Sequence, residues 1–220
     1  MSLSVLYCDR DLAVIVKPVG VLSEDHPTEP CVPAMLRDVI GDSQAYVGTV
    51  HRLDKQVGGL MVYALTPSMT GKLSASFAEN SAGKEYLAVL AGIPEKARDT
   101  LTDLLFHDRQ KNKTYVVKRK RGGVKEASLS YLVLARREDK TLVRVQLHTG
   151  RTHQIRVQFA SRGLSLEGDR RYGGGEGDPA LFAYRLTFRH PQTGETMCFS
   201  QLPEGNRLGG LSLNGLEEIL

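Results

Sequence analysis

Short apolar runs, several of them alternating with polar residues, dominate the pattern of the chain. From Val143 through Val145 to Leu147 every second side chain is apolar, as in a strand with one face in the core and one in water. Runs of this kind predict strands at Leu3 to Tyr7, Leu12 to Val16, Leu60 to Leu65, Tyr86 to Leu90, Ser128 to Ala135, Thr141 to His148, Leu181 to Phe188 and Thr196 to Ser200.

Helical spacing is confined to fewer segments. One helix is predicted from Pro67 toward Asn80, because Thr66 can cap its first turn and proline suits its first position. Another is predicted from Pro33 to Ile40, before Gly41. These two helices account for most of the helical signal in the first half of the chain.

A third helix is predicted after the strand that ends at residue 148. Thr152 can cap it, Ile155 and Phe159 share one face, and Gly163 can end it in the left-handed conformation. Because helices are few and do not alternate strictly with the strands, the pattern predicts an α+β fold with a mainly antiparallel sheet. No repeat or linker divides the chain, so we expect one domain over residues 1–220, with room for two lobes and a peripheral tail at 203–220.

Composition narrows the class of protein. With 220 residues, 41% of them hydrophobic and 25% charged, the chain is ordinary for a globular protein, which excludes disordered and fibrous architectures. Twenty-nine Lys and Arg against 25 Asp and Glu give a net charge of +4, which favours acidic partners.

Targeting and redox signals point inside the cell. The N-terminus lacks the pattern of a secretory leader, and no uncharged apolar run reaches the roughly 18 to 20 residues that span a bilayer. Cys8, Cys31 and Cys198 are odd in number and far apart, so we expect free thiols and neither a disulfide framework nor a thiolate metal site. A soluble, cytoplasmic protein without a membrane partner is the expectation.

Two segments carry candidate chemistry. His51-Arg52-Leu53-Asp54 precedes a Gly58-Gly59 turn and puts a carboxylate beside an arginine where the backbone can approach closely, although a surface ion pair at a turn would look the same. Arg151 follows Gly150 at the predicted helix N-terminus, where it could clamp an RNA phosphate or a catalytic carboxylate, or simply be a solvated loop arginine.

These segments belong to an ordered set of motifs: His51-Arg52-Leu53-Asp54, Gly59-Leu60-Met61, Lys84-x-Tyr86-x-Ala88, Gly150-Arg151-Thr152-His153-Gln154-Ile155-Arg156 and Gly168-Asp169-x-x-Tyr172-Gly173. The set resembles the RluA-type pseudouridine synthases. Three shorter matches extend the resemblance to about residues 5–203: Lys17-Pro18-x-Gly20, Ala127-x-x-x-Tyr131 and His190-Pro191.

The resemblance implies the pseudouridine synthase fold, a mixed and mostly antiparallel bent sheet with a central catalytic cleft and a few flanking helices. It also implies that Asp54 attacks the target nucleoside, that Arg151 pairs with Asp54, that Tyr86 stacks on the flipped uracil and that Arg52 helps to displace the base. Leu166 matches the apolar residue that closes the pocket. We expect a catalytic domain only, without the N-terminal RNA-binding module of many relatives, acting as a monomer on rRNA or tRNA.

Elementary chemistry agrees with these roles. Uridine and pseudouridine contain the same atoms, so the reaction breaks a carbon–nitrogen bond, turns the base and rejoins it through carbon 5, and we expect no cofactor. A carboxylate in a dry pocket needs an arginine to keep it ionised, and an unstacked base needs an aromatic surface. Without the motifs, Tyr86 would be read as a core aromatic of its strand.

The histidines do not predict a metal site. His51, His148 and His153 lack a third ligand at helical spacing, so we expect no metal. His51 and His153 are instead expected at the substrate-binding site, where they would hydrogen-bond the loops that carry Asp54 and Arg151.

A basic tract runs from Lys111 to Lys125. We interpret it as a hairpin arm with Gly122-Gly123 near its tip, suited to phosphate contacts, while a merely solvated hairpin is the alternative. The cations expected to bind the substrate RNA are Lys118, Arg119, Lys120 and Arg121.

The chain departs from the family pattern at Val57-Gly58-Gly59, where Thr-Ser-Gly is usual, and glycine is expected to loosen that turn. Phe182 stands where a histidine is common, and the usual Val-His after the first motif is missing. Two other functions stay open on this evidence: an RNA-binding protein that has lost catalysis, and an aspartate-nucleophile glycosidic hydrolase, which would need a second acid that no motif supplies.

Overall fold

The computed structural model describes residues 3–79, 82–204 and 208, and the chain forms two compact units. Unit 1 comprises Met1–Lys84 and Ala183–Leu202, and unit 2 comprises Glu85–Phe182 and Pro203–Leu220. The sequence predicted that residues 1–220 form one domain. That the two units belong to one domain stays a prediction. Most of the tail predicted at 203–220 lies outside the described residues.

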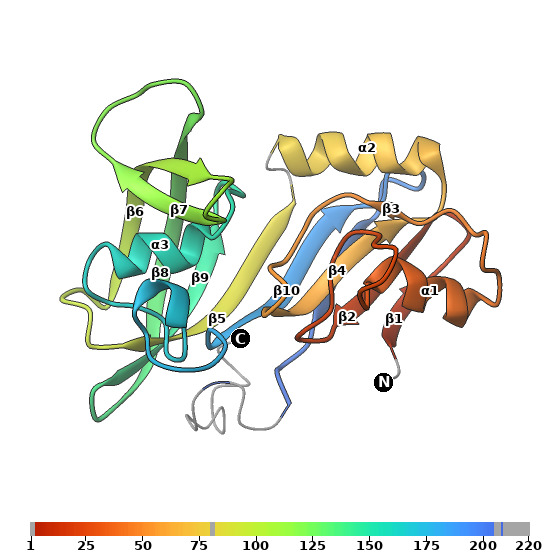
Figure 1. The fold of residues 1–220 in the computed structure, drawn as a ribbon. Helices are drawn as coiled ribbons and strands as arrows, with labels where there is room; N and C mark the ends of the chain where they lie inside the picture. Colours follow the sequence, from red (N-terminus) through yellow and green to blue (C-terminus); the bar gives the residue numbers. More distant parts are fainter. Residues whose placement is uncertain (1–2, 80–81, 205–207, 209–220) are drawn as a thin grey trace. The chain divides into compact units, whose positions relative to one another are not determined.

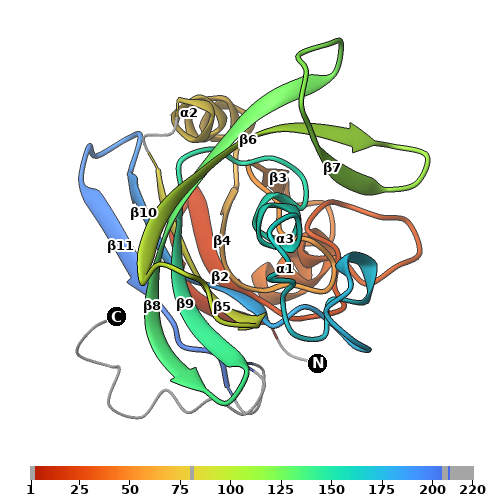
Figure 2. The same cartoon turned by 90° about the vertical axis from the view of Figure 1, so that its left-hand side faces the viewer.

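Unit 1 is built on strands in the order β1-β2-β4-β10-β11, with the short β3 paired to β4 (Figures 1 and 2). Every pairing resolved among them is antiparallel. All of these strands except β3, which has only two residues, were predicted from short apolar runs, some of them alternating. Their bounds are β1 Ser4–Cys8, β2 Leu12–Lys17, β3 Gly48–Thr49, β4 Gly58–Ala64, β10 Leu181–Arg189 and β11 Thr196–Ser200.

Helix α2 (Pro67–Ala78) covers one face of this sheet. It begins as predicted, since the Thr66 hydroxyl accepts the Met69 N–H at 3.2 Å. Met69, Leu73 and Phe77, spaced at four residues, are buried with side chains from β2, β4 and β10. The helix therefore supplies the apolar layer over the strands that flank residues 51–57.

Helix α1 (Val32–Ile40) also agrees with the sequence. It ends at Gly41, whose φ of 79° lies in the left-handed region and whose N–H bonds to the Arg37 carbonyl. The helix starts one residue before Pro33, which occupies a first-turn position where no N–H is needed.

Unit 2 is built on strands in the order β5-β9-β8-β6-β7. The pairs β6–β7, β6–β8 and β8–β9 are antiparallel. Strand β6 was not predicted, because most of its residues are only partly buried and its alternation is weak. The bounds are β5 Gly83–Ala91, β6 Arg98–Asp108, β7 Lys113–Val117, β8 Val124–Arg137 and β9 Lys140–Leu147.

The predicted hairpin of the basic tract is wrong. Strand β7 pairs with β6, and β6 pairs with β8 on its other side, so β7 and β8 are not partners. Residues 118–123 instead form a loop that carries the chain from β7 to β8, which Figure 2 shows extending beyond the end of β6. The error follows from missing β6, since without it the nearest partner for β7 along the chain was β8.

Helix α3 (Gln154–Ala160) packs against β6, β7 and β8 of unit 2 (Figure 2). Ile155 and Phe159 are buried as predicted, but Thr152 is not the cap. The cap is His153, in the left-handed conformation with φ 54°. Because the backbone is left-handed at His153, the helix begins at Gln154 and Thr152 lies outside it. The regular helix ends at Ala160, and the chain then turns at Gly163, which is left-handed with φ 74° as predicted, while the Leu164 N–H bonds back to the Phe159 carbonyl at 3.1 Å.

Candidate active site

Asp54 lies on a loop of unit 1 between β3 and β4, and the residue before it is fixed by Ser23. The buried Ser23 hydroxyl accepts the Leu53 N–H at 3.1 Å and donates to the Leu53 carbonyl at 2.8 Å. Ser23 is held in turn by Tyr63, whose buried hydroxyl donates to the Ser23 carbonyl at 2.8 Å. The chain entering Asp54 therefore has little freedom.

The residue after Asp54 is fixed in the same way. The Lys55 carbonyl accepts the Gly20 N–H at 2.8 Å and the Lys17 ammonium at 3.2 Å. Within the loop, the Val57 N–H bonds back to the Asp54 carbonyl at 2.9 Å and closes a turn. Asp54 is thus half-buried on a backbone that is anchored on both sides.

Lys17, at the end of β2, is an almost completely buried cation. Besides Lys55, its ammonium donates to the carbonyls of Pro18 at 2.8 Å and Val21 at 2.7 Å. Burial lowers the pKa of Lys17 to about 8, and the nearby Asp54 carboxylate opposes that shift. Lys17 therefore joins the turn after β2 to the loop of Asp54.

Two cations flank Asp54 in the sequence, and both are paired with an acidic segment. Arg52 contacts Glu24 at 2.8 Å between Nη1 and Oε2, and Lys55 forms an ion pair with Glu29. Both pairs are exposed to solvent, unlike the contacts of Lys17. Arg52, which the family resemblance implicates in displacing the base, is therefore bound to the Glu24 carboxylate in this structure.

His51 hydrogen-bonds β4, the strand that follows the Asp54 loop. Its Nε2 accepts the Val62 N–H at 3.1 Å, and its ring stacks on Phe77 with centroids 4.6 Å apart. Its Nδ1 is enclosed and makes no hydrogen bond to any part of the chain that the structure describes. Burial lowers the pKa of His51 to about 3, so the imidazole is neutral and carries its proton on Nδ1.

The two glycines after Asp54, Gly58 and Gly59, begin β4 and are buried. A Cβ on Gly59, whose φ is 126°, would lie 2.3 Å from the Ala183 carbonyl oxygen of β10. Glycine at position 59 is therefore required by close strand packing, and the missing hydroxyls at Val57 and Gly58 leave the backbone of the turn intact.

In unit 2, Arg151 lies just before the cap of α3. Its Nε donates to the Glu126 carbonyl at 3.0 Å, and its N–H donates to Gln154 Oε1 at 3.0 Å. The Gln154 side chain also bonds to Ser128 on β8. The guanidinium is exposed but tethered, so the loop presents it in a defined position.

Tyr86 and Leu166, the other residues of unit 2 expected at the substrate, are both buried. Tyr86 lies on β5 and is 6% exposed. Leu166 is fully buried and forms an antiparallel bridge with Leu90 at the other end of β5. Both residues therefore depend on β5 for their position.

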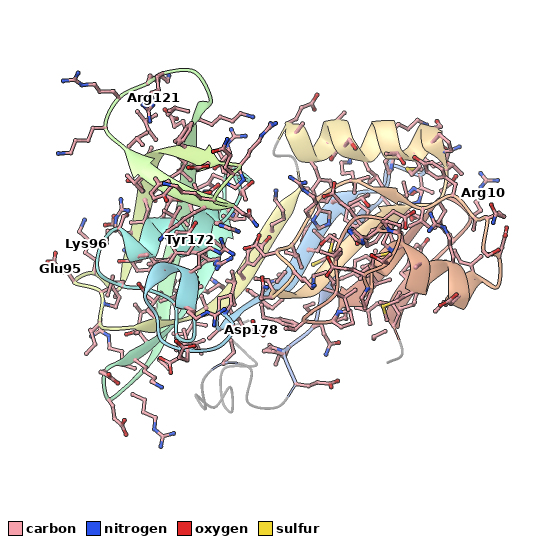
Figure 3. All side chains as sticks on the ribbon, viewed as in Figure 1. Arg10, Glu95, Lys96, Arg121, Tyr172 and Asp178 are labelled. Atoms are coloured by element: carbon pink, nitrogen blue, oxygen red, sulfur yellow. The ribbon has the colours of Figure 1, made fainter. Side chains whose placement is uncertain are left out.

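Tyr172 joins several parts of unit 2 around α3 (Figure 3). Its hydroxyl accepts the Thr114 N–H of β7 at 2.9 Å and lies 2.9 Å from Nδ1 of the buried His153. Arg156 and Lys113 both lie over its ring, about equally close to the centroid, at 5.1 Å and 5.3 Å. Burial raises the pKa of Tyr172, which keeps the hydroxyl protonated. His153 thus connects the N-terminus of α3 to Tyr172, and its predicted place at the substrate stays a prediction.

A buried ion pair fixes the segment that contains Tyr172. Arg156 of α3 binds Asp169 through two hydrogen bonds of 2.7 Å and 2.8 Å, and both side chains are at most 5% exposed. A bidentate pair of this kind is strongly directional. It holds Gly168-Asp169-x-x-Tyr172-Gly173 against the motif that begins at Gly150.

The positive charge of the chain is concentrated in the basic tract of unit 2. Residues 111–125 contain seven Lys and Arg and no acidic residue, whereas the rest of the chain has 22 basic against 25 acidic residues. The side chains from Lys118 to Arg121 are exposed, and Figure 3 labels Arg121 on this loop. The loop therefore offers a compact cationic surface.

Residues 11–161 match the RNA pseudouridylate synthase family. The chain belongs to this family. An uncharacterized RNA pseudouridine synthase of Aquifex aeolicus is 36% identical, over 90% of this chain and 69% of its own length. Ribosomal large subunit pseudouridine synthase D of Pseudomonas aeruginosa is 34% identical, over 93% of this chain and 69% of its own length. This synthase is therefore an isomerase that acts on RNA, as the ordered motifs predicted.

A solved structure supports the fold independently. Human RNA pseudouridylate synthase domain containing 1 has a TM-score of 0.76 with this synthase at 24% identity, and the match covers 92% of this chain and 84% of that one. The α+β pseudouridine synthase fold expected from the sequence, with its mostly antiparallel strands, is confirmed.

Three further observations on the synthase concern the expected absences. Within the described residues, no three His, Cys, Asp or Glu side chains gather in a group that could hold a metal ion. None of the described helices has the length and apolarity needed to cross a bilayer. Among the described residues, Cys8, Cys31 and Cys198 form no disulfide.

Sequence reasoning missed several residues that shape the synthase site. Ser23 and Glu24 had no recognisable signal, because their partners Leu53 and Arg52 are 30 and 28 residues away along the chain. Lys17 and Tyr172 belong to motifs that the sequence analysis recognised, so the motifs could have identified both as candidates. The motifs do not indicate which residues Lys17 and Tyr172 contact.

Proposed function

We propose that this enzyme converts uridine to pseudouridine in ribosomal large-subunit RNA, using Asp54 as the carboxylate that attacks the flipped nucleotide. The observation that carries the proposal is the anchoring of the Asp54 loop by Ser23 on one side and by Lys17 and Gly20 on the other. A reacting group must be held within a fraction of an ångström of its target, and a backbone fixed on both sides supports that demand.

The remaining roles in the proposal follow the family resemblance. Arg151 would pair with the Asp54 carboxylate and keep it ionised, Tyr86 would stack on the uracil, and Arg52 would occupy the space that the flipped base leaves. Leu166 would close the apolar side of the pocket. The buried position of Tyr86 and the tethered guanidinium of Arg151 are compatible with these tasks.

Ribosomal RNA is preferred to transfer RNA as the substrate because of the named relatives. Several curated relatives at 31–34% identity are ribosomal large subunit pseudouridine synthases, including those of Zymomonas mobilis and Pseudomonas aeruginosa. The proposal further takes the enzyme to be a cytoplasmic monomer, working where ribosomal RNA is accessible.

Substitution of the proposed nucleophile tests the mechanism. Asp54→Asn is expected to abolish isomerisation, because an amide cannot attack the ribose or the base, while RNA affinity changes little. The measurement is pseudouridine formation in ribosomal RNA from cells that lack the gene, with binding followed separately.

Asp25→Asn is the matched control, since it removes one carboxylate charge from a residue of unit 1 whose partner is Arg37 of α1. We expect the control variant to retain turnover. Turnover by Asp54→Asn close to that of the wild type would eliminate Asp54 from the mechanism.

A further inference from the structure

An acidic segment borders the loop of Asp54. Residues 24–29, here called the acidic loop, have the sequence Glu24-Asp25-His26-Pro27-Thr28-Glu29 and connect β2 to α1. Hydrogen bonds close the base of this loop, from the Leu22 N–H to the Pro30 carbonyl and from the Val32 N–H to the Leu22 carbonyl, each 2.9 Å long. The carboxylates are therefore carried on a short loop with a fixed base.

Two of the three carboxylates bind the cations on either side of Asp54. Glu24 binds Arg52 at 2.8 Å, and Glu29 binds Lys55. The third, Asp25, binds Arg37 of α1 instead, through contacts of 3.1 Å and 2.6 Å. Glu24 and Glu29 thus neutralise the two positive charges that flank Asp54 in the sequence.

These two pairs are suited to exchange. The side chains of Arg52 and Glu24 are 61% and 59% exposed, and those of Lys55 and Glu29 are 37% and 44% exposed. Exposed ion pairs contribute little to stability, so a phosphate can replace the carboxylate without unfolding any part of the unit. The backbone of Asp54 is held by separate, buried bonds, and the exchange would leave it in place.

We propose that the acidic loop mimics RNA phosphates: in the free enzyme Glu24 and Glu29 occupy Arg52 and Lys55, and the RNA backbone displaces them when it binds. The inference rests on RNA as the substrate of the Asp54 site. Its consequence is selectivity, because an RNA gains these two contacts only if its shape brings phosphates to both cations at once, and other RNAs meet two carboxylates there.

Binding measurements on the whole chain test this role. The probe is a fluorescent RNA hairpin with a uridine in its loop, titrated by anisotropy at several salt concentrations. Glu24→Gln is expected to tighten binding about threefold, and Glu24→Gln with Glu29→Gln about threefold to tenfold, as expected for the release of exposed ion pairs. The salt dependence should become steeper, because the freed cations then contact phosphate without competition.

Asp25→Asn is the matched control, since it removes the same charge from the same loop but frees an arginine on α1. It is expected to change affinity much less than Glu24→Gln. A second control combines Glu24→Gln with Arg52→Gln: without the arginine, removing Glu24 should give no more than the effect of Asp25→Asn.

Two results would overturn the proposal. Equal tightening by Glu24→Gln and Asp25→Asn would show a general charge effect, and weaker binding by Glu24→Gln would show that Glu24 positions Arg52 for RNA. The ratios of binding affinity between variants and wild type do not depend on turnover. If the enzyme left ribosomal RNA unmodified, the proposed function would be wrong. The affinity ratios would still decide the role of the acidic loop.

Discussion

His51 and Lys17 are two enclosed titratable side chains in unit 1. Burial shifts the pKa of each toward the neutral form, to about 3 for His51 and to about 8 for Lys17. Lys17 remains charged at neutral pH because three backbone carbonyls and the Asp54 carboxylate surround it. His51 is neutral and serves as a hydrogen-bond acceptor for β4.

The shift at His51 predicts an acid-sensitive fold. An unfolded histidine takes up a proton below pH 6.5 or so, whereas the native imidazole stays neutral down to pH of about 3, so protons favour the unfolded state between these values. Stability attributable to His51 should therefore fall by about 1.4 kcal/mol per pH unit as the pH drops from 6 to 4. Urea unfolding followed by circular dichroism at several pH values measures this slope.

His51→Gln should be less stable than the wild type at pH 7, because it loses the stacking on Phe77, but its stability should depend less on acid. His26→Gln, at an exposed position, is the control and should keep the wild-type slope. If His51→Gln lost stability with pH as steeply as the wild type, another group would cause the acid sensitivity.

At the scale of elements, the loop between β7 and β8 is the clearest cationic feature. Lys118, Arg119, Lys120 and Arg121 are exposed, and the Arg121 guanidinium lies 5.1 Å from the centroid of the Phe106 ring on β6. The neighbouring strand β7 is an edge strand of unit 2, paired only to β6 among the described strands. A short edge strand followed by a charged loop also prevents pairing with other chains, which is the alternative purpose of these charges.

Replacement of all four cations of this loop by glutamine is expected to weaken RNA binding for every RNA sequence tested. It should also flatten the plot of log affinity against log salt by about 3, since each phosphate contact contributes about 0.7 to 0.9 to that slope. Anisotropy titrations with the RNA hairpin measure both quantities.

An equal loss of charge elsewhere is the control for this variant. Arg10, Lys96, Arg136 and Arg137 are exposed cations outside the basic tract, and their joint replacement by glutamine removes the same charge. The control should change the salt slope far less. An unaltered slope in the loop variant would mean that the loop is solvated and takes no part in binding.

At the scale of the whole molecule, the proposed substrate makes a prediction about cellular RNA. Deletion of the gene should remove pseudouridine from one or a few positions of large-subunit ribosomal RNA, and the wild-type gene should restore it while Asp54→Asn should not. Pseudouridine mapping of total RNA measures this outcome. If deletion of the gene removed pseudouridine from transfer RNA alone, the substrate would be transfer RNA and not ribosomal RNA.

The sequence by itself determined the parts that depend on neighbouring residues. Alternation located most strands, Thr66 and Gly41 set the limits of two helices, and the ordered motifs around Asp54 and Arg151 identified the family. These features follow from side-chain periodicity, from capping and from short motifs, all of which are written in consecutive residues.

Only the tertiary structure decided which distant residues meet. It paired β7 with β6, made His153 the cap of α3, placed Ser23 against Leu53 and turned Glu24 toward Arg52. The physical reason is that such contacts are selected by packing and hydrogen-bond geometry across long stretches of chain, where a carboxylate or a hydroxyl has many possible partners. The sequence therefore led to the proposal of Asp54 as the reacting residue, and the folded units decided what holds that residue in place.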